Sequence, residues 1–270
     1  MPETPVPTIV IEPPVPGRAF SLYDDPSADH DDRVQRSVQW LRDSAQQHPG
    51  RIVQATSLGA EDIVLTDLIV RYGIPIDVAM IDTGRLHPET LALRARAEAH
   101  WGIRIEVFAP EPEAVAAFEA EHGPHAMYRS PALRHACCGL RKLQPLQRLL
   151  AGRTAWVTGL RREQSAQRAD VPIVTTDDAG RTKLNPLAEW SWGDVWHHIR
   201  RHGVPYNPLH DAFMPSIGCA PCTRPIAVGE DFRAGRWWWE DDHRRECGLH
   251  LPSPARHAAS PMASTLVQPL

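Results

Sequence analysis

The chain has 270 residues, of which 42% are hydrophobic and 23% charged; this fits one or two globular domains and excludes disorder along the whole length. Lys and Arg number 29 against 33 Asp and Glu, so the net charge of −4 gives no overall basic field, and we expect no nucleic-acid partner. The sequence has no run of about 18 apolar residues and begins without a secretory signal, which predicts no membrane span and a cytoplasmic location.

Hydrophobic periodicity predicts strands and helices that alternate between two proline-rich ends. We expect a flexible N-terminal arm over residues 1–30 and a disordered tail over 251–270. Helices are expected over 31–48, 61–72, 88–100 and 191–202. Strands are expected over 51–56, 76–81, 103–108 and 154–159, with a short hairpin over 171–184. This alternation indicates an α/β fold with a doubly wound, mostly parallel sheet.

The first expected strand runs into a Gly-containing loop that leads directly into a helix. The loop consists of Ser57, Leu58, Gly59, Ala60, Glu61 and Asp62. In an open parallel sheet, ligands bind beyond the carboxyl ends of the strands, and backbone N–H groups at a helix N-terminus favour phosphate or sulfate. The same residues also fit an ordinary helix start, with Ser57 as the N-cap and Glu61 in the first turn.

Two further strand ends carry polar residues of the same kind, over 82–88 and 159–165. The second of these contains Arg161 and Arg162, whose planar guanidinium groups suit phosphate or sulfate oxygens. The alternative is that both are surface arginines paired with a neighbour such as Glu163. Taken together, the three strand ends predict a nucleotide-like ligand.

Five cysteines in a cytoplasmic protein need a metal, redox or catalytic explanation rather than disulfides. Cys137 and Cys138 are adjacent, and Cys219 and Cys222 form a C-x-x-C pair. Two such pairs fit an iron–sulfur cluster, a zinc site, a reactive dithiol or buried free thiols. Zinc ligands are usually offset by two to four residues, whereas a cubane cluster offers a separate iron to each neighbouring thiolate. The pattern favours the cluster and leaves the other interpretations open.

The fifth cysteine, Cys247, lies near the C-terminal tail. Arg244, Arg245 and His250 would stabilise its thiolate, while Glu246 would oppose it. We interpret Cys247 as a reactive thiol; the alternative is an unreactive surface cysteine.

This set of cysteines resembles that of the assimilatory adenylyl-sulfate reductases, which belong with the 3′-phosphoadenylyl-sulfate reductases. The resemblance covers roughly residues 35–250 and includes the motifs SLGAED, DTGRLHPET, TGLRREQS, LNPLAEWSWGDVW and VPYNPLHD. The five cysteines are its specific part, because members restricted to the 3′-phosphorylated substrate typically lack the two pairs.

The resemblance implies an adenine nucleotide α-hydrolase-like domain over 31–230 and a mobile catalytic segment over 231–250. One 4Fe–4S cluster would be held by Cys137, Cys138, Cys219 and Cys222. Cys247 would attack the sulfur of adenylyl sulfate, releasing AMP and leaving an S-sulfocysteine from which thioredoxin releases sulfite, in sulfate assimilation and cysteine biosynthesis. The implied substrate-binding residues are Ser57, Gly59, Ala60, Glu61, Asp62, Lys142, Arg162, Arg233, Arg236 and His250.

Several alternatives stay open at this point. The loop differs from the Ser-Phe-Ser-Gly or Ser-Phe-Gly of many relatives, so 3′-phosphoadenylyl sulfate, or both nucleotides, can be the substrate. An ATP-pyrophosphatase-type thiolation enzyme would share the loop, although the chain lacks a Ser-Gly-Gly-x-Asp-Ser motif. A zinc-stabilised binding module is the non-enzymatic alternative. The sequence does not give the oligomeric state, which leaves a homo-oligomer open.

Overall fold

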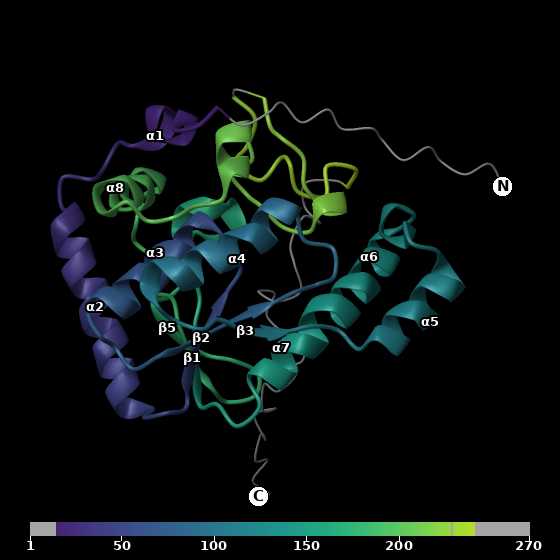
Figure 1. Cartoon of the computed structure of the whole chain (residues 1–270), viewed down its shortest axis with the longest axis horizontal. Helices are drawn as coiled ribbons and strands as arrows, with labels where there is room; N and C mark the ends of the chain where they lie inside the picture. The colour runs from purple at the N-terminus through teal and green to yellow at the C-terminus, as the bar shows by residue number, and fades with distance from the viewer. Residues whose placement is uncertain (1–14, 228, 241–270) are drawn as a thin grey trace, which may run out of the picture.

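The computed structural model describes residues 15–227 and 229–240, and Figure 1 shows helices on both sides of a central sheet. The strands are β1 (Ile52–Thr56), β2 (Asp77–Ile81), β3 (Glu106–Phe108), β4 (Ala155–Val157), β5 (Val174–Thr176) and β6 (Thr182–Leu184). Their order across the sheet is β3-β2-β1-β4-β6-β5. All neighbouring strands are parallel except the antiparallel pair of β5 and β6. The expected doubly wound, mostly parallel sheet and its terminal hairpin are confirmed.

The α-helices are α1 (Arg18–Tyr23), α2 (His30–Gln47), α3 (Ala60–Arg71), α4 (Pro88–Trp101), α5 (Pro112–His122), α6 (Pro131–Cys138), α7 (Gln144–Leu149) and α8 (Trp192–His202). The shorter helical turns are η1 (Ala126–Tyr128), η2 (Gly139–Leu143), η3 (Arg162–Gln164), η4 (Ala166–Arg168), η5 (Pro208–Ala212) and η6 (Ala220–Cys222). The four predicted helices correspond to α2, α3, α4 and α8, with ends that agree within one residue. Helices α5, α6 and α7 lie in a stretch for which the sequence analysis predicted no element.

The two faces of the sheet bury different sets of apolar side chains, because successive residues of a strand point to opposite faces. On one face, Ile52 and Val157 belong to the main core with α2, α3, α4 and α8. On the other face, Val53 and Trp156 pack against Leu146 of α7. Both faces are therefore covered, as a mostly parallel sheet requires.

The expectation of a flexible arm over residues 1–30 does not hold for residues 15–30. Residues 1–14 lie outside the described residues, but α1 packs against α8 and η5, and its Ala19 is fully buried. The backbone N–H of Ala19 donates to Asp211 at 2.8 Å, and that of Ser27 donates to Asp194 at 2.8 Å. These two buried carboxylates need donors, and the N-terminal segment supplies them.

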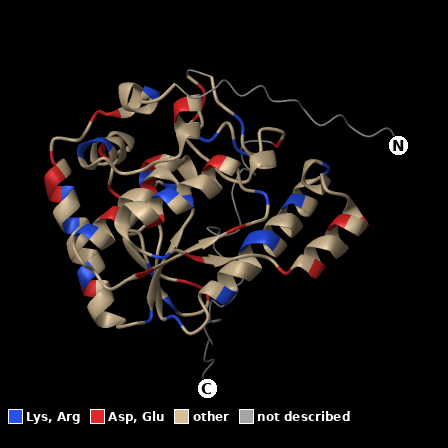
Figure 2. Cartoon of the chain, in the orientation of Figure 1, with Lys and Arg blue, Asp and Glu red and all other residues tan. Residues whose placement is uncertain are grey.

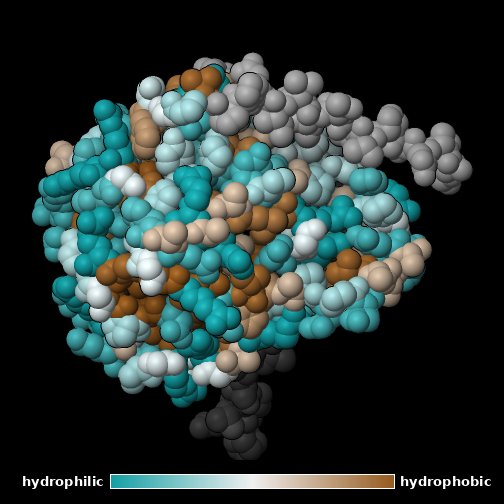
Figure 3. All heavy atoms as spheres, in the orientation of Figure 1, coloured by the Kyte–Doolittle hydropathy of each residue, from teal (hydrophilic) through white to brown (hydrophobic). Residues whose placement is uncertain are grey.

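Charged and apolar side chains are mixed on the face of the molecule that the figures show. Figure 2 shows Lys and Arg interspersed with Asp and Glu along the helices, and Figure 3 shows hydrophobic side chains scattered among hydrophilic ones. The exposed large apolar residues of the described ranges come from separate parts of the chain: Val15, Leu22, Leu91, Val107 and Val174. Within those ranges, no helix is both long enough and apolar enough to cross a membrane.

Candidate active site

A cavity with a volume of about 230 Å³ opens at the carboxyl ends of β1 and β4. The chain leaves β1 toward β2 on one side and returns as β4 on the other, which makes this the topological switch point of the sheet. Crevices at such points are the usual ligand sites of open α/β sheets. The inner part of the cavity is apolar and extends over the sheet face beneath α7, where it is lined by Ala55, Ala79, Ile81, Leu146 and Trp156.

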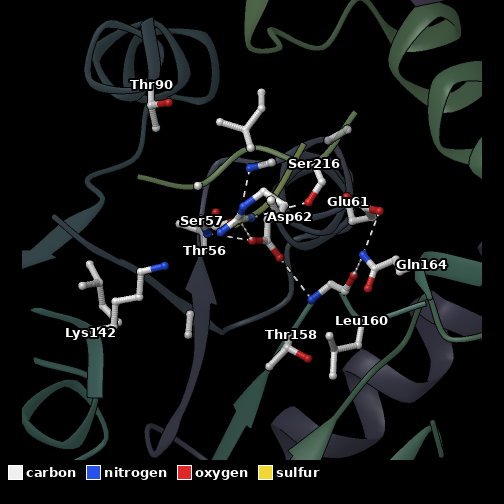
Figure 4. Close-up of a pocket in the computed structure, with 18 of the residues that line it drawn as sticks. Thr56, Ser57, Glu61, Asp62, Thr90, Lys142, Thr158, Leu160, Gln164 and Ser216 are labelled. Atoms are coloured by element: carbon white, nitrogen blue, oxygen red, sulfur yellow. Dashed lines mark hydrogen bonds between the residues drawn. The ribbon is translucent and has the colours of Figure 1, made fainter. Parts of the chain in front are cut away.

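The loop after β1 is closed by Asp62, in the first turn of α3. Asp62 accepts hydrogen bonds from the backbone N–H and the hydroxyl of Ser57, both at 2.6 Å, and from the N–H of Gly159 at 3.1 Å (Figure 4). Burial, together with the neighbouring Glu61, raises the pKa of the Asp62 carboxyl to about 6. The N-cap of α3 is Gly59, so Ser57 does not cap the helix. Ser57, Gly59, Ala60, Glu61 and Asp62 all line the cavity, as expected.

Glu61 supports the segment that follows β4. Its Oε1 atom accepts hydrogen bonds from Arg161 Nε at 3.0 Å and from Gln164 Nε2 at 2.8 Å. Arg161 is fully buried and also donates to the carbonyl of Trp190 at 3.3 Å. A buried guanidinium requires a charged partner. The Glu61 carboxylate is therefore engaged by the protein, although the residue borders the cavity.

Three of the cationic side chains that line the cavity come from two segments. Lys142 comes from η2, and Figure 4 shows its amine pointing toward Thr56 and Ser57. Arg233 and Arg236 come from the last described segment. Arg236 donates to the carbonyl of Cys222 at 3.3 Å and to the hydroxyl of Ser216 at 3.5 Å, which fixes its guanidinium at the rim.

The structure does not bring Arg162 to the cavity. Its Nε donates to the carbonyl of Val171 at 3.1 Å, and its guanidinium lies 3.4 Å from Glu189 on the outer side. Arg161, the preceding residue, takes the inward position opposite Glu61. Instead, η3 and η4 return Arg168 to the cavity wall, where it is buried and donates to Gln164 at 2.6 Å. Arg168 therefore replaces Arg162 as the candidate contact.

A buried imidazole that the sequence analysis did not single out also borders the cavity. His210 of η5 lies against Trp192 and Trp196, with ring centres 6.0 and 5.2 Å away. Burial lowers its pKa to about 4, so the ring is neutral at physiological pH. Its motif, VPYNPLHD, was noted only as part of the family resemblance.

The four paired cysteines line one second, small cavity. Cys137 and Cys138 end α6 just before η2, a π-helical turn of the kind often found at functional sites. Cys219 is the N-cap of η6 and Cys222 is its last residue, and the N–H of Cys222 donates to the carbonyl of Cys219 at 2.9 Å. All four are free thiols and are buried. The predicted meeting of the two pairs is thus observed.

Two influences act on the pKa values of these thiols: burial raises them, and neighbouring cations lower them. Burial raises the pKa of Cys137, although Arg141 and Arg85 act to lower it. Burial and the neighbouring Cys219 raise the pKa of Cys222 to about 12. The hydroxyl of Thr83 lies 3.3 Å from the Cys219 sulfur. Four buried thiols that face one another and two arginines suit a group that binds them as thiolates.

The two cavities share a wall. Lys142, Cys219 and Trp237 line both of them, so the cationic rim of the larger cavity stands directly beside the cysteines. In the residues that the structure describes, no group of three or more His, Cys, Asp or Glu side chains is arranged to hold a metal ion.

Residues 231–240, the first part of the segment expected to be mobile, contact the rest of the domain in this structure. The backbone of Arg224 bonds to that of Gly235 at 2.9 Å, and Trp237 is buried beside the cysteines. Glu240 pairs with the buried Arg134 at 2.6 Å. Residues up to 240 are thus packed against the α/β body, and Cys247 and His250 lie outside the described residues.

Comparison with protein families places residues 51–225 in the phosphoadenosine phosphosulfate reductase domain. An adenosine 5′-phosphosulfate reductase from Allochromatium vinosum is 58% identical over 200 residues, which cover 74% of this chain and 78% of that protein. The enzyme of the same name from Burkholderia cepacia is 47% identical over 232 residues, 84% of this chain and 92% of that protein.

The fold of this chain is similar to that of two solved structures. A phosphoadenylyl-sulfate reductase from Candida auris, crystallised with phosphate, has a TM-score of 0.59 at 26% identity and covers 73% of this chain and 97% of that chain. An FMN adenylyltransferase from Candida glabrata has a TM-score of 0.53 at 14% identity, covering 78% and 73%, and is similar in fold alone. The adenine nucleotide α-hydrolase-like architecture is confirmed.

Proposed function

Because this chain belongs to the phosphoadenosine phosphosulfate reductase family, we propose that it reduces adenosine 5′-phosphosulfate to sulfite and AMP, with thioredoxin as reductant. The observation that carries this proposal is the wall shared by the cavity at the strand ends and the cysteine cavity. It places positive charge and thiol chemistry at one point, beyond the carboxyl ends of the strands.

The cavity offers a separate region to each part of such a nucleotide. The apolar inner part suits adenine, since flat aromatic groups bind in apolar slots. The N-terminus of α3 and the side chains of Lys142, Arg233 and Arg236 suit the phosphate and sulfate oxygens. Attack on an anionic sulfate by a thiolate is slow unless nearby cations offset the repulsion, and these three residues would do so.

The nucleophile would be Cys247. Its thiolate attacks the sulfur of the substrate, an S–S bond forms, and the bond from sulfur to the phosphate oxygen breaks, so that AMP leaves with the electron pair. Cys247 follows Trp237, which borders the cavity, by ten residues, and a chain of that length reaches at most about 35 Å. Arg233, Arg236 and His250 would accompany it at the sulfate.

Thioredoxin would complete the cycle in two exchanges. One thioredoxin thiolate attacks the Cys247 sulfur, which releases sulfite and forms a mixed disulfide. The second thioredoxin thiol then displaces Cys247 as a thiolate, leaving oxidised thioredoxin. Two electrons pass from the dithiol to the sulfate sulfur, so the reaction balances without another reductant. Free thiols of this kind are maintained in the cytoplasm, where we place the enzyme.

Cys137, Cys138, Cys219 and Cys222 would hold one 4Fe–4S cluster. The four thiols surround one cavity. Cys137 and Cys138 are adjacent, and a cubane, in which each thiolate binds a different iron, accommodates adjacent cysteines more readily than zinc does, which favours the cluster. When bound, the cluster would supply structural support and negative charge opposite Lys142, while the thiols supply the electrons.

Both cysteine pairs, and relatives of up to 58% identity named for the unsubstituted nucleotide, favour adenosine 5′-phosphosulfate over its 3′-phosphorylated form. We expect a much higher kcat/KM for the former. Equal values for the two nucleotides would instead support the dual-specificity alternative.

The mechanism is tested by trapping the covalent intermediate. Incubation with adenosine 5′-phosphosulfate and without thioredoxin should add one sulfite mass to the peptide that contains Cys247, and reduced thioredoxin should remove it. Cys247→Ser should abolish sulfite release but keep iron and acid-labile sulfide, whereas Cys219→Ser should lose both iron and activity. An adduct on another cysteine, or steady turnover by Cys247→Ser, would exclude this mechanism. A zinc content without sulfide would exclude the cluster.

A further inference from the structure

One acidic residue stands beside the cysteine cavity and binds two of the cations that surround it. Glu119 lies on α5, and its Oε1 atom accepts hydrogen bonds from Arg85 and Arg141, both at 2.6 Å. These arginines come from different segments, since Arg85 follows β2 and Arg141 belongs to η2. Both line the cysteine cavity together with Cys137.

Each arginine also makes a contact that links it to the second cysteine pair. The guanidinium of Arg141 donates to the carbonyl of Thr83 at 2.9 Å, and the Thr83 hydroxyl lies 3.3 Å from the Cys219 sulfur. The carbonyl of Arg85 accepts from the N–H of Ala220 at 2.8 Å. Arg141 is therefore linked to the second cysteine pair through its side chain, and Arg85 through its backbone.

Helix α5 has little other attachment to the body. It contains no fully buried residue, and its Phe118 packs at the edge of the apolar cluster around the cysteines. In Figure 1, α5 lies at the periphery, next to α6. The ion pairs of Glu119 are thus a specific contact in an element that otherwise contributes little to the core.

We propose that Glu119 is a positioning residue, which holds Arg85 and Arg141 against the cysteines and thereby slows the loss of iron from the bound cluster. The inference rests on the proposed function, because it takes the four cysteines as the ligands of a cluster. A carboxylate shared by two guanidinium groups fixes the orientation of both groups. The two arginines and the carboxylate together leave one net positive charge facing the thiolates. Without it, the arginines can turn toward solvent, and thiolate–iron bonds exchange more readily with water.

The test compares Glu119→Gln with Glu121→Gln in the iron-loaded protein. Glu121 is a matched control, because it lies on the same helix, its side chain is 75% exposed, and its ion pair is with the adjacent His122. The readout is the rate at which iron passes to a ferrous chelator, followed by loss of the visible absorption band. We expect Glu119→Gln to release iron at least about fivefold faster than wild type, allowing for the partial exposure of Glu119, and Glu121→Gln to stay within about twofold.

A double-mutant cycle separates positioning from mere support of the helix. If Glu119 acts through the two arginines, then Glu119→Gln should add little to the effect of Arg85→Gln combined with Arg141→Gln, with the arginine pair taken as one unit of the cycle. Additive effects, or a loss of thermal stability that accounts for the faster release, would overturn the inference, as would unchanged release in Glu119→Gln. Wild-type protein without iron or sulfide would overturn the cluster proposal as well, whereas an iron-replete wild type with an unaffected variant would overturn this inference alone.

Discussion

Gly218 precedes Cys219, and its missing side chain makes room for the guanidinium of Arg236. A Cβ atom built at Gly218 would lie 2.2 Å from Nη2 and 2.5 Å from Cζ of Arg236. The backbone of Gly218 lies outside the left-handed region, so alanine can adopt it, and the clash is with the end of a side chain. Gly218→Ala should therefore displace Arg236 while leaving the fold in place.

The size of the effect follows from the distances. Ordinary contact needs about 3.4 Å, so the guanidinium must withdraw by about 1.2 Å. That movement breaks its contacts with Ser216 and Cys222, at 3.5 and 3.3 Å. Misplacement of a charged group by about 1 Å can cost up to about 100-fold in rate, so we expect kcat/KM to fall by about 10- to 100-fold.

The assay is sulfite release with thioredoxin in excess, combined with iron analysis. Gly139→Ala is the matched control, because Gly139 also adjoins a paired cysteine, has helical backbone angles, and an added Cβ there meets nothing within 4 Å. Gly218→Ala should have no further effect in an Arg236→Ala background. Normal kcat/KM in Gly218→Ala, or an equal loss in Gly139→Ala, would refute the assignment of Arg236 to the substrate.

Two further predictions concern stability. Glu61→Gln should lower the free energy of unfolding in urea by about 3–5 kcal/mol, because it removes the buried carboxylate that pairs with the buried Arg161. Glu163→Gln removes a 60% exposed carboxylate 3.5 Å from the same arginine and should cost less than about 1 kcal/mol. Burial lowers the pKa of His210 from 6.5 to about 4, so as the pH falls the unfolded chain binds the proton before the folded chain does. The free energy of unfolding should therefore decrease by about 3 kcal/mol as the pH falls from 6.5 to 4. Asp62, with a pKa raised to about 6, should increase the free energy of unfolding as the pH falls from 6 to 3.8. The measurement is therefore the difference in free energy of unfolding between wild type and His210→Gln across this pH range. Parallel pH profiles of the two proteins would contradict the prediction.

The parts of the fold that the sequence predicts are those with a strong local pattern. Helix α2 carries Val34, Val38 and Leu41 on one buried face, and its ends agree with the prediction within one residue. Helix α5 could not be predicted in this way, because none of its side chains is fully buried and no apolar face marks it. Helix α1 depends on Asp211, 192 residues away from Ala19, and no local signal contains that contact.

The same distinction explains which site residues the sequence identifies. Cysteines are rare and their spacing limits their chemistry, so two pairs point to one centre even though 80 residues separate them.

Arginines are common, and the segment 158–168, which contains Arg161, Arg162 and Arg168, does not say which of them faces the ligand. The choice depends on Glu61, which draws Arg161 inward and turns its neighbour toward Glu189, and on two 3₁₀ turns that return Arg168 to the wall. Residue types thus indicate which chemistry is present, whereas the direction of each side chain depends on partners about 100 residues away in sequence, as Glu61 is from Arg161.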